Sequence, residues 1–177
     1  MKNFKQIVIA PTLVVAISAV VLFFIGQAPP HLPGYTPAPK QFDSVEQASS
    51  ELGIDVKTPV YFPNYLTWPP AEIKGQIKPF TMVELAFNSS DELNIILLVY
   101  QIASDSPDLP IALPWIKTVS ERIPTIIGTN PGEIIIGQRA DGQIINAAHW
   151  KSGGQHFLVV TVMPVKELLA IAKSLEF

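Results

Sequence analysis

The sequence contains no cysteine and has few charged residues. The missing cysteines exclude disulfides, thiol nucleophiles and thiolate metal sites. Charged residues make up 15% of the 177 residues and hydrophobic residues 48%, which argues against a disordered chain. The sequence has 12 Lys and Arg residues against 15 Asp and Glu residues, and the basic residues do not cluster in a stripe. A nucleic-acid partner is therefore not expected, because its electrostatic footprint is missing.

Histidine is also scarce, and no nucleophile motif of the G-x-S-x-G or Ser-x-x-Lys form is present. Two of the three histidines, His149 and His156, flank a predicted hairpin and lie on the same sheet face within diagonal reach. No third ligand stands at a useful spacing, so we expect no metal site and no cofactor. The chain is predicted not to be an enzyme. A buried Asp or Glu beside either histidine is the observation that would favour catalysis.

The longest hydrophobic run, residues 7–25, holds 19 positions without a charge. As a helix it would be about 28 Å long, close to the ~30 Å hydrocarbon core of a bilayer. Lys2 and Lys5 precede it, and the next basic residue is Lys40. The positive-inside rule then predicts a single-pass membrane protein with a cytoplasmic stub (1–6), a transmembrane anchor (7–26) and an extracytoplasmic remainder.

A cleaved secretory signal is the alternative for this segment, with small residues at 26–28 as a cleavage site. The two prolines that follow and the length of the run favour an uncleaved anchor. Residues 27–40 contain five prolines. They predict a semi-rigid spacer of polyproline-II type.

Residues 41–177 show the signals of an α+β domain. A helix is predicted over 42–52, capped by Asp43 or Ser44 and closed by Gly53. Residues 59–70, rich in proline and aromatics, predict an edge strand and an irregular loop. Strands are predicted at 82–87, 93–102, 133–139, 143–150 and 156–162, and a closing helix at 164–177. The predicted fold is therefore an N-terminal transmembrane helix followed by an antiparallel sheet of about five strands, with helices at both ends of the domain.

Residues 103–132 are longer than a hairpin connection needs and combine five prolines with many apolar residues. A short helix is predicted over 114–123. The segment either covers one sheet face or forms a mobile flap that lines a pocket, touches lipid or receives a partner. For the second alternative the candidate contact residues are Leu109, Ile111, Leu113, Trp115 and Ile116.

Three stretches, residues 59–66, 150–157 and 167–175, carry a resemblance. Their order resembles an uncharacterised family of bacterial extracytoplasmic domains behind a single membrane anchor. Members are described as domains of unknown function, and some occur in proteins resembling sigma-factor regulators or sporulation-associated membrane proteins. The resemblance implies no catalytic residues.

These observations predict a non-enzymatic interaction or sensory module, tethered through residues 7–26 outside the cytoplasm of a bacterium. Its expected partner is an envelope protein. The alternative is a binder or carrier of a small apolar ligand such as a lipid. That alternative predicts a cavity lined by Ile95, Leu97 and residues of the 103–132 segment.

Overall fold

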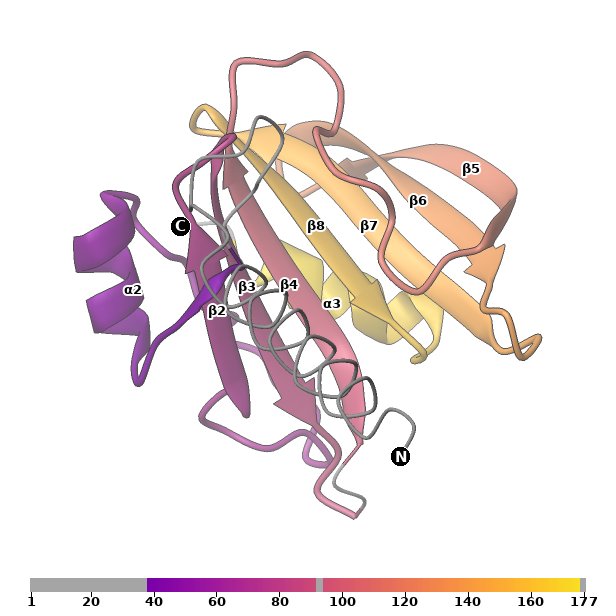
Figure 1. The fold of residues 1–177 in the computed structure, drawn as a ribbon. Helices are drawn as coiled ribbons and strands as arrows, with labels where there is room; N and C mark the ends of the chain where they lie inside the picture. The colour runs from indigo at the N-terminus through magenta and orange to yellow at the C-terminus, as the bar shows by residue number, and fades with distance from the viewer. Residues whose placement is uncertain (1–37, 92–93, 176–177) are drawn as a thin grey trace, which may run out of the picture. The chain divides into compact units, whose positions relative to one another are not determined.

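Eight strands and two short helices form within residues 38–91 and 94–175, the parts of the chain that the computed structural model describes (Figure 1). In chain order they are β1 (Lys40–Gln41), α2 (Val45–Leu52), β2 (Glu72–Gln76), β3 (Thr81–Asn88), β4 (Ile95–Ala103), β5 (Thr118–Ile127), β6 (Asn130–Gln138), β7 (Ile144–Ser152), β8 (Gln155–Thr161) and α3 (Val165–Lys173).

The strands pair antiparallel in one sheet with the order β1-β2-β3-β4-β8-β7-β6-β5. Strand β4 is central, whereas β5, the next strand along the chain, lies at one edge. The connection between them, residues 104–117, must therefore cross β8, β7 and β6. At about 4.8 Å per strand, that crossing spans roughly 19 Å. The topology accounts for the length of this segment.

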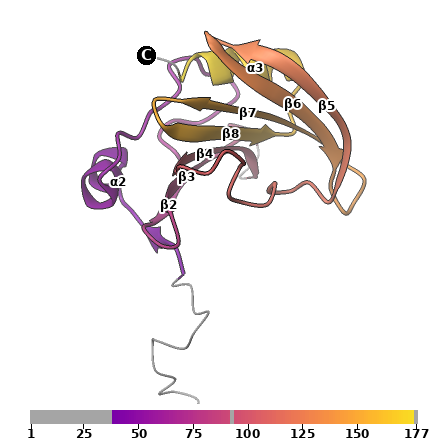
Figure 2. The ribbon, with the colours of Figure 1, turned by 90° about the horizontal axis from the view of Figure 1, so that it is seen from above.

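Successive side chains of each strand point to opposite faces of the sheet, so each face has its own hydrophobic core. The core on the first face is the larger of the two. Helix α3 covers this face, and residues 104–117 lie on the other side (Figure 2). The buried residues of the first core are Phe42, Ala48, Leu52, Val56, Leu66, Ile73, Val83, Leu85, Phe87, Leu97, Val99, Ile127, Ile134, Ala148, Trp150, Phe157, Val159, Met163, Leu168, Ile171, Ala172 and Leu175.

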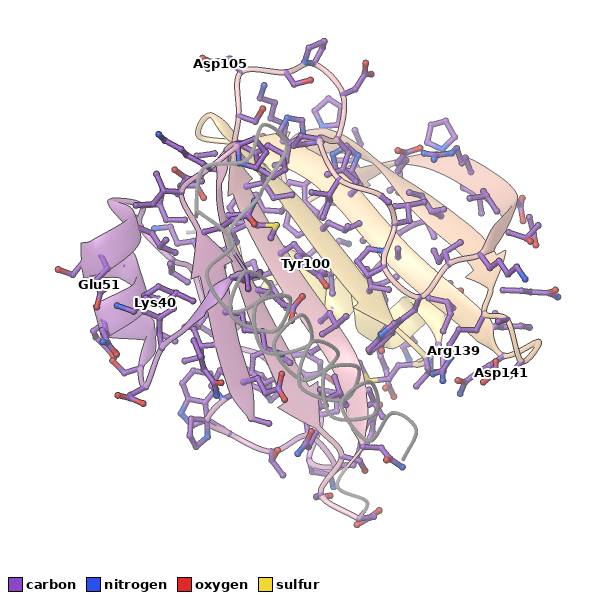
Figure 3. The ribbon with its side chains drawn as sticks, in the orientation of Figure 1. Lys40, Glu51, Tyr100, Asp105, Arg139 and Asp141 are labelled. Atoms are coloured by element: carbon purple, nitrogen blue, oxygen red, sulfur yellow. The ribbon has the colours of Figure 1, made fainter. Side chains whose placement is uncertain are left out.

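The second face carries a smaller core, which residues 104–117 cover. Figure 3 shows Tyr100 in the middle of this face and Asp105 at the outer bend of the covering segment. The buried residues of the second core are Ala86, Leu98, Tyr100, Ile102, Ile135, Ile145, Ala147, Leu158 and Val160. The sheet is therefore buried on both sides, which explains the unbroken apolar run in β4.

Helix α2 begins and ends where the sequence predicts. The Ser44 side chain accepts a hydrogen bond from the Gln47 backbone N–H (3.1 Å), and Gly53 ends the helix with φ of 67°. Only glycine adopts that backbone conformation without a steric penalty. Ala48 and Leu52 are the buried residues of this helix. Helix α3 buries Leu168, Ile171 and Ala172 in the same core.

The β7–β8 hairpin is also confirmed. It turns at Gly153 and Gly154, with φ of 56° and 80°. Trp150 pairs with Phe157 across the two strands, and their rings stack with centroids 5.1 Å apart. This register places His149 and His156 on the same face, as predicted.

The predicted fold class is wrong. The described residues form an eight-stranded sheet with two short helices, in place of the predicted sheet of about five strands with helices at both ends. The predicted helix over 114–123 is also wrong, because most of it lies in β5. Its apolar residues recur at a helical spacing, but pairing with β6 determines the conformation. Residues 59–66 form no strand; they make one isolated bridge, from Leu66 to Ser89.

The predicted anchor, residues 7–26, lies outside the described residues, as do the stub 1–6 and most of the spacer 27–40. Neither α2 nor α3, the two helices of the described residues, is long and apolar enough to cross a membrane.

Candidate functional site

The flap, defined here as residues 104–117, brings the five predicted contact residues onto the second face of the sheet. Each of them is half-buried and packs against the second core. In this structure they cover the sheet, which is one of the two alternatives that the sequence leaves open. The five residues are Leu109, Ile111, Leu113, Trp115 and Ile116.

The C-terminal end of the flap is pressed closely onto β6. Gly137 allows this approach, because a Cβ atom there would come within 2.5 Å of Ile116 Cγ2. The Lys117 backbone N–H then donates to the Gln138 carbonyl at 2.9 Å. Just before these contacts Trp115 has φ of 62°, the one positive value for a non-glycine residue in the described part of the chain. A bulky residue in that conformation stores backbone strain.

The N-terminal end of the flap is held by a chain of polar contacts that starts at the Ser106 carbonyl. This oxygen accepts hydrogen bonds from His156 Nε2 at 2.9 Å and from Lys151 Nζ at 3.3 Å. His156 Nδ1 lies 3.1 Å from His149 Nε2, and the two rings are parallel within 5°. Beyond His149, Nδ1 lies 3.4 Å from Glu133 Oε1.

The strand register produces this cluster. Glu133 pairs directly with His149 across β6 and β7, and Lys151 pairs with His156 across β7 and β8. Paired residues in antiparallel strands share a face, so all four side chains point toward the flap. From edge strand β5, Arg122 donates to Glu133 Oε1 at 2.8 Å.

Sequence reasoning missed Glu133 and Arg122. The strand containing Glu133 was expected, but its partner and register were not. The turn signal Asp141-Gly142 was visible, but a two-residue turn there would have placed Glu133 opposite Trp150, one position away from its observed partner His149. No comparable signal pointed to Arg122, because β5 was expected to be helical.

Burial disfavours the charged form of His149. His156 is completely buried, and the His149 side chain is 16% exposed. Burial lowers the pKa of His149; the hydrogen bond to Glu133 opposes this effect, while electrostatic repulsion from His156 and Arg122 adds to it. The lowered pKa of His149 therefore favours loss of the contacts between the histidines and the flap in acid.

The cluster contains the observation that would favour catalysis, since the Glu133 carboxylate lies beside His149. Its geometry, however, supports a different role. All four ring nitrogens of the two histidines face Glu133, each other or the Ser106 carbonyl. Each ring nitrogen therefore already faces a polar atom of the protein. Within the described residues, no group of three His, Asp or Glu side chains is arranged to hold a metal ion.

Two adjoining clefts open on either side of the Glu133–His149 pair, with volumes of about 390 and 380 Å³. The first lies between the flap and the sheet and is lined by Pro107, Asp108, Leu109, Ile111, Leu113, Arg122, Glu133, Ile135 and His149. The second is lined by Pro107, Pro124, Pro131, Gly132, Glu133, His149, Trp150, Lys151 and His156. Volumes of this size suit a small ligand or individual side chains of a partner.

The cavity expected from Ile95, Leu97 and the flap is not formed. Ile95 packs against the second core and Leu97 belongs to the first, so they lie on opposite faces of the sheet. The flap covers only one of these faces. The first cleft contains flap residues but neither Ile95 nor Leu97.

Strand β5 is exposed along nearly its whole length, and among the described strands it pairs with β6 alone. Ile126 is 57%, Val119 41% and Ile123 39% exposed. Ile127 and Asn130 close a two-residue turn, so alternation directs the backbone groups of Arg122, Pro124 and Ile126 away from β6. Pro124 fits this pattern, because its missing N–H then falls on the outer side.

Comparison of this chain with family models, with curated proteins and with solved structures finds no match. The resemblance to bacterial extracytoplasmic domains therefore stays a prediction.

Proposed function

We propose that this chain is a non-enzymatic binding module that takes an extended segment of a protein partner onto the outer edge of β5. The observation that carries the proposal is this ten-residue edge, on which Val119, Ile123 and Ile126 are exposed. Proteins commonly blunt such edges with charges, bulges or short strands, because unpaired backbone groups attract another strand. At the opposite edge, β1 has only two residues.

Strand addition also gives the clefts a role. In this mode of recognition, backbone hydrogen bonds supply affinity, and pockets for alternate side chains supply specificity. Arg122 and Pro124 lie on the outer strand and line the first and second cleft respectively. Side chains of an added strand that point to this face would enter the clefts beside Glu133.

The setting of this activity is proposed from the sequence. Residues 7–26 would anchor the chain in a bacterial membrane and hold the domain outside the cytoplasm. The partner would then be another protein of the envelope.

The test uses ten-residue peptides selected from a displayed library against the full chain in detergent micelles. We expect the selected peptides to slow amide hydrogen exchange at Arg122 and Ile126, whose N–H groups point outward. Ile126→Lys should weaken peptide binding at least tenfold, because a charge at the edge disfavours strand pairing. Binding is measured by fluorescence anisotropy of the labelled peptide.

Ile144→Lys is the matched control, since Ile144 is also 57% exposed but lies on β7. It should change the affinity less than twofold. Equal weakening by both substitutions, or protection from exchange away from β5, would contradict strand addition.

A small amphipathic ligand is a second candidate, favoured by the composition of the first cleft. Leu109, Ile111 and Leu113 form an apolar wall, and Arg122 stands at the same cleft. Native mass spectrometry of the full chain, purified from a bacterial host in detergent, tests this candidate. A stoichiometric added mass that disappears on denaturation supports it, and a chain without added mass counts against it.

A further inference from the structure

We infer that His149 and His156 form a proton-operated latch, which holds the flap on the sheet at neutral pH and releases it in acid. The latch would regulate the binding site proposed above, because the flap forms one wall of the first cleft. Only this effect on binding rests on the proposed function. The latch itself follows from the hydrogen bonds of the cluster.

Counting N–H groups shows why the neutral pair closes the flap. The Ser106 carbonyl can only accept, so His156 Nε2 must carry a hydrogen. In a neutral ring His156 Nδ1 is then an acceptor, and His149 Nε2 donates to it. These two bonds, at 2.9 and 3.1 Å, use both hydrogens of the neutral pair. The contact left without a hydrogen is the longest, from His149 Nδ1 to Glu133.

Protonation of both rings does not fit this arrangement. A first proton on His149 Nδ1 completes the Glu133 contact, but burial, His156 and Arg122 all oppose it. A second proton on His156 Nδ1 places two N–H groups against each other at 3.1 Å. The bond between the histidines is then lost, and two positive charges are buried side by side.

The charged groups around the pair reinforce this direction. Arg122 on β5 and Lys151 on β7 are the positively charged side chains beside the pair. On the negative side are Glu133 on β6, already paired with Arg122, and Asp108 of the flap, which lines the first cleft. Asp105 lies at the outer bend of the flap (Figure 3).

The sign of the pH effect follows from linkage. In the closed state the pKa of His149 is lowered, while in a released state the ring is solvated and its pKa returns toward the ordinary value of about 6.5. The released state therefore binds more protons below that pH, and acid shifts the population toward it.

The experiment exploits the absence of cysteine from the chain. A single cysteine replaces Ile111, which is half-buried on the flap, or its exposed neighbour Ala112. Both are labelled with a thiol reagent in the full chain at pH 7.5 and pH 5.0. The ratio of the two labelling rates cancels the pH dependence of the thiolate. We expect the ratio of Ile111→Cys to Ala112→Cys to rise at least tenfold in acid.

Two variants and one control keep this result specific. In the background of His149→Gln, and separately of His156→Gln, the ratio should change less than twofold between the two pH values. Ala148→Cys, in the first core, should stay unreactive at both pH values. A ratio that is flat in the unmodified background, a rise that persists in both variants, or labelling of Ala148→Cys in acid would overturn the latch.

Peptide binding at β5, measured at the same two pH values, separates the two proposals. A pH-dependent ratio without any peptide binding leaves the latch standing and removes the function. Peptide binding with a flat ratio removes only the latch.

Discussion

Replacing Trp150 by alanine should lower the free energy of unfolding by about 3–5 kcal/mol, the range typical of a buried tryptophan. Trp150 is 1% exposed and stacks on Phe157 with an interplanar angle of 13°. Its removal would leave a cavity in the first core that strands β6 to β8 cannot close without moving. Urea unfolding followed by circular dichroism measures the loss.

Trp68→Ala is the matched control, because Trp68 is 55% exposed. It still packs on Phe62, with ring centroids 5.3 Å apart, so we expect a loss of about 1 kcal/mol. Equal losses at the two positions would show that Trp150 is not a central residue of the first core.

A conservative change at Trp150 should be much milder than alanine. The indole N–H of Trp150 is buried without a hydrogen-bond partner, and an unpaired buried donor costs about 1–3 kcal/mol. Trp150→Phe removes this group and keeps an aromatic ring against Phe157. We expect it to lose less than half of what alanine loses, in the same unfolding measurement.

The elements that could be predicted from sequence are those whose signals lie within a few residues of one another. Helix α2 has its cap at Ser44 and its terminator at Gly53, and the β7–β8 hairpin has its turn at Gly153 and Gly154. From that turn the pairing of Trp150 with Phe157 follows by counting. Local backbone preferences determine such elements, so the residues themselves are sufficient.

The number of strands could not be predicted, because the missed strands depend on their neighbours. Strand β2 has Ile73 as its one buried hydrophobic residue, with Gly75 buried at the second inward position. The glycine is required there: a Cβ atom would lie 2.7 Å from Leu52 Cδ1 and 2.8 Å from the Met82 carbonyl. Such a close approach to a helix and a strand is invisible in the sequence. In β2, as in β5, pairing with the neighbouring strand outweighs the local conformational preference of the residues.

The candidate site was predicted only in part, because some of its residues come from strands that are far apart in the sequence. The histidines came from one hairpin and were placed correctly relative to each other. Glu133 and Arg122 come from strands β6 and β5, whose order in the sheet is set by the long crossing from β4. The crossing also brings Ser106 to His156, 50 positions away along the chain. These polar contacts join four separate segments of the chain, so they could be predicted only with knowledge of the sheet topology.

Gly132→Ala should destabilise the domain by about 3 kcal/mol, because overpacking against backbone leaves little room for relaxation. A Cβ atom at Gly132 would lie 2.7 Å from the His149 carbonyl, 2.9 Å from Trp150 Cβ and 3.0 Å from Ile127 Cδ1. The first of these neighbours is backbone, so β6 and β7 would have to separate. Thermal or urea unfolding measures the effect.

Gly142→Ala provides the comparison, since a Cβ atom there meets open space and only the φ of 86° opposes it. That strain is worth about 1 kcal/mol. The excess loss at Gly132 isolates the close approach of the two strands, and a loss no larger than at Gly142 would contradict it. Gly132 also precedes Glu133, so separation of β6 from β7 would move the carboxylate away from His149. The pH dependence of flap labelling should therefore weaken together with stability in Gly132→Ala, and should persist in Gly142→Ala.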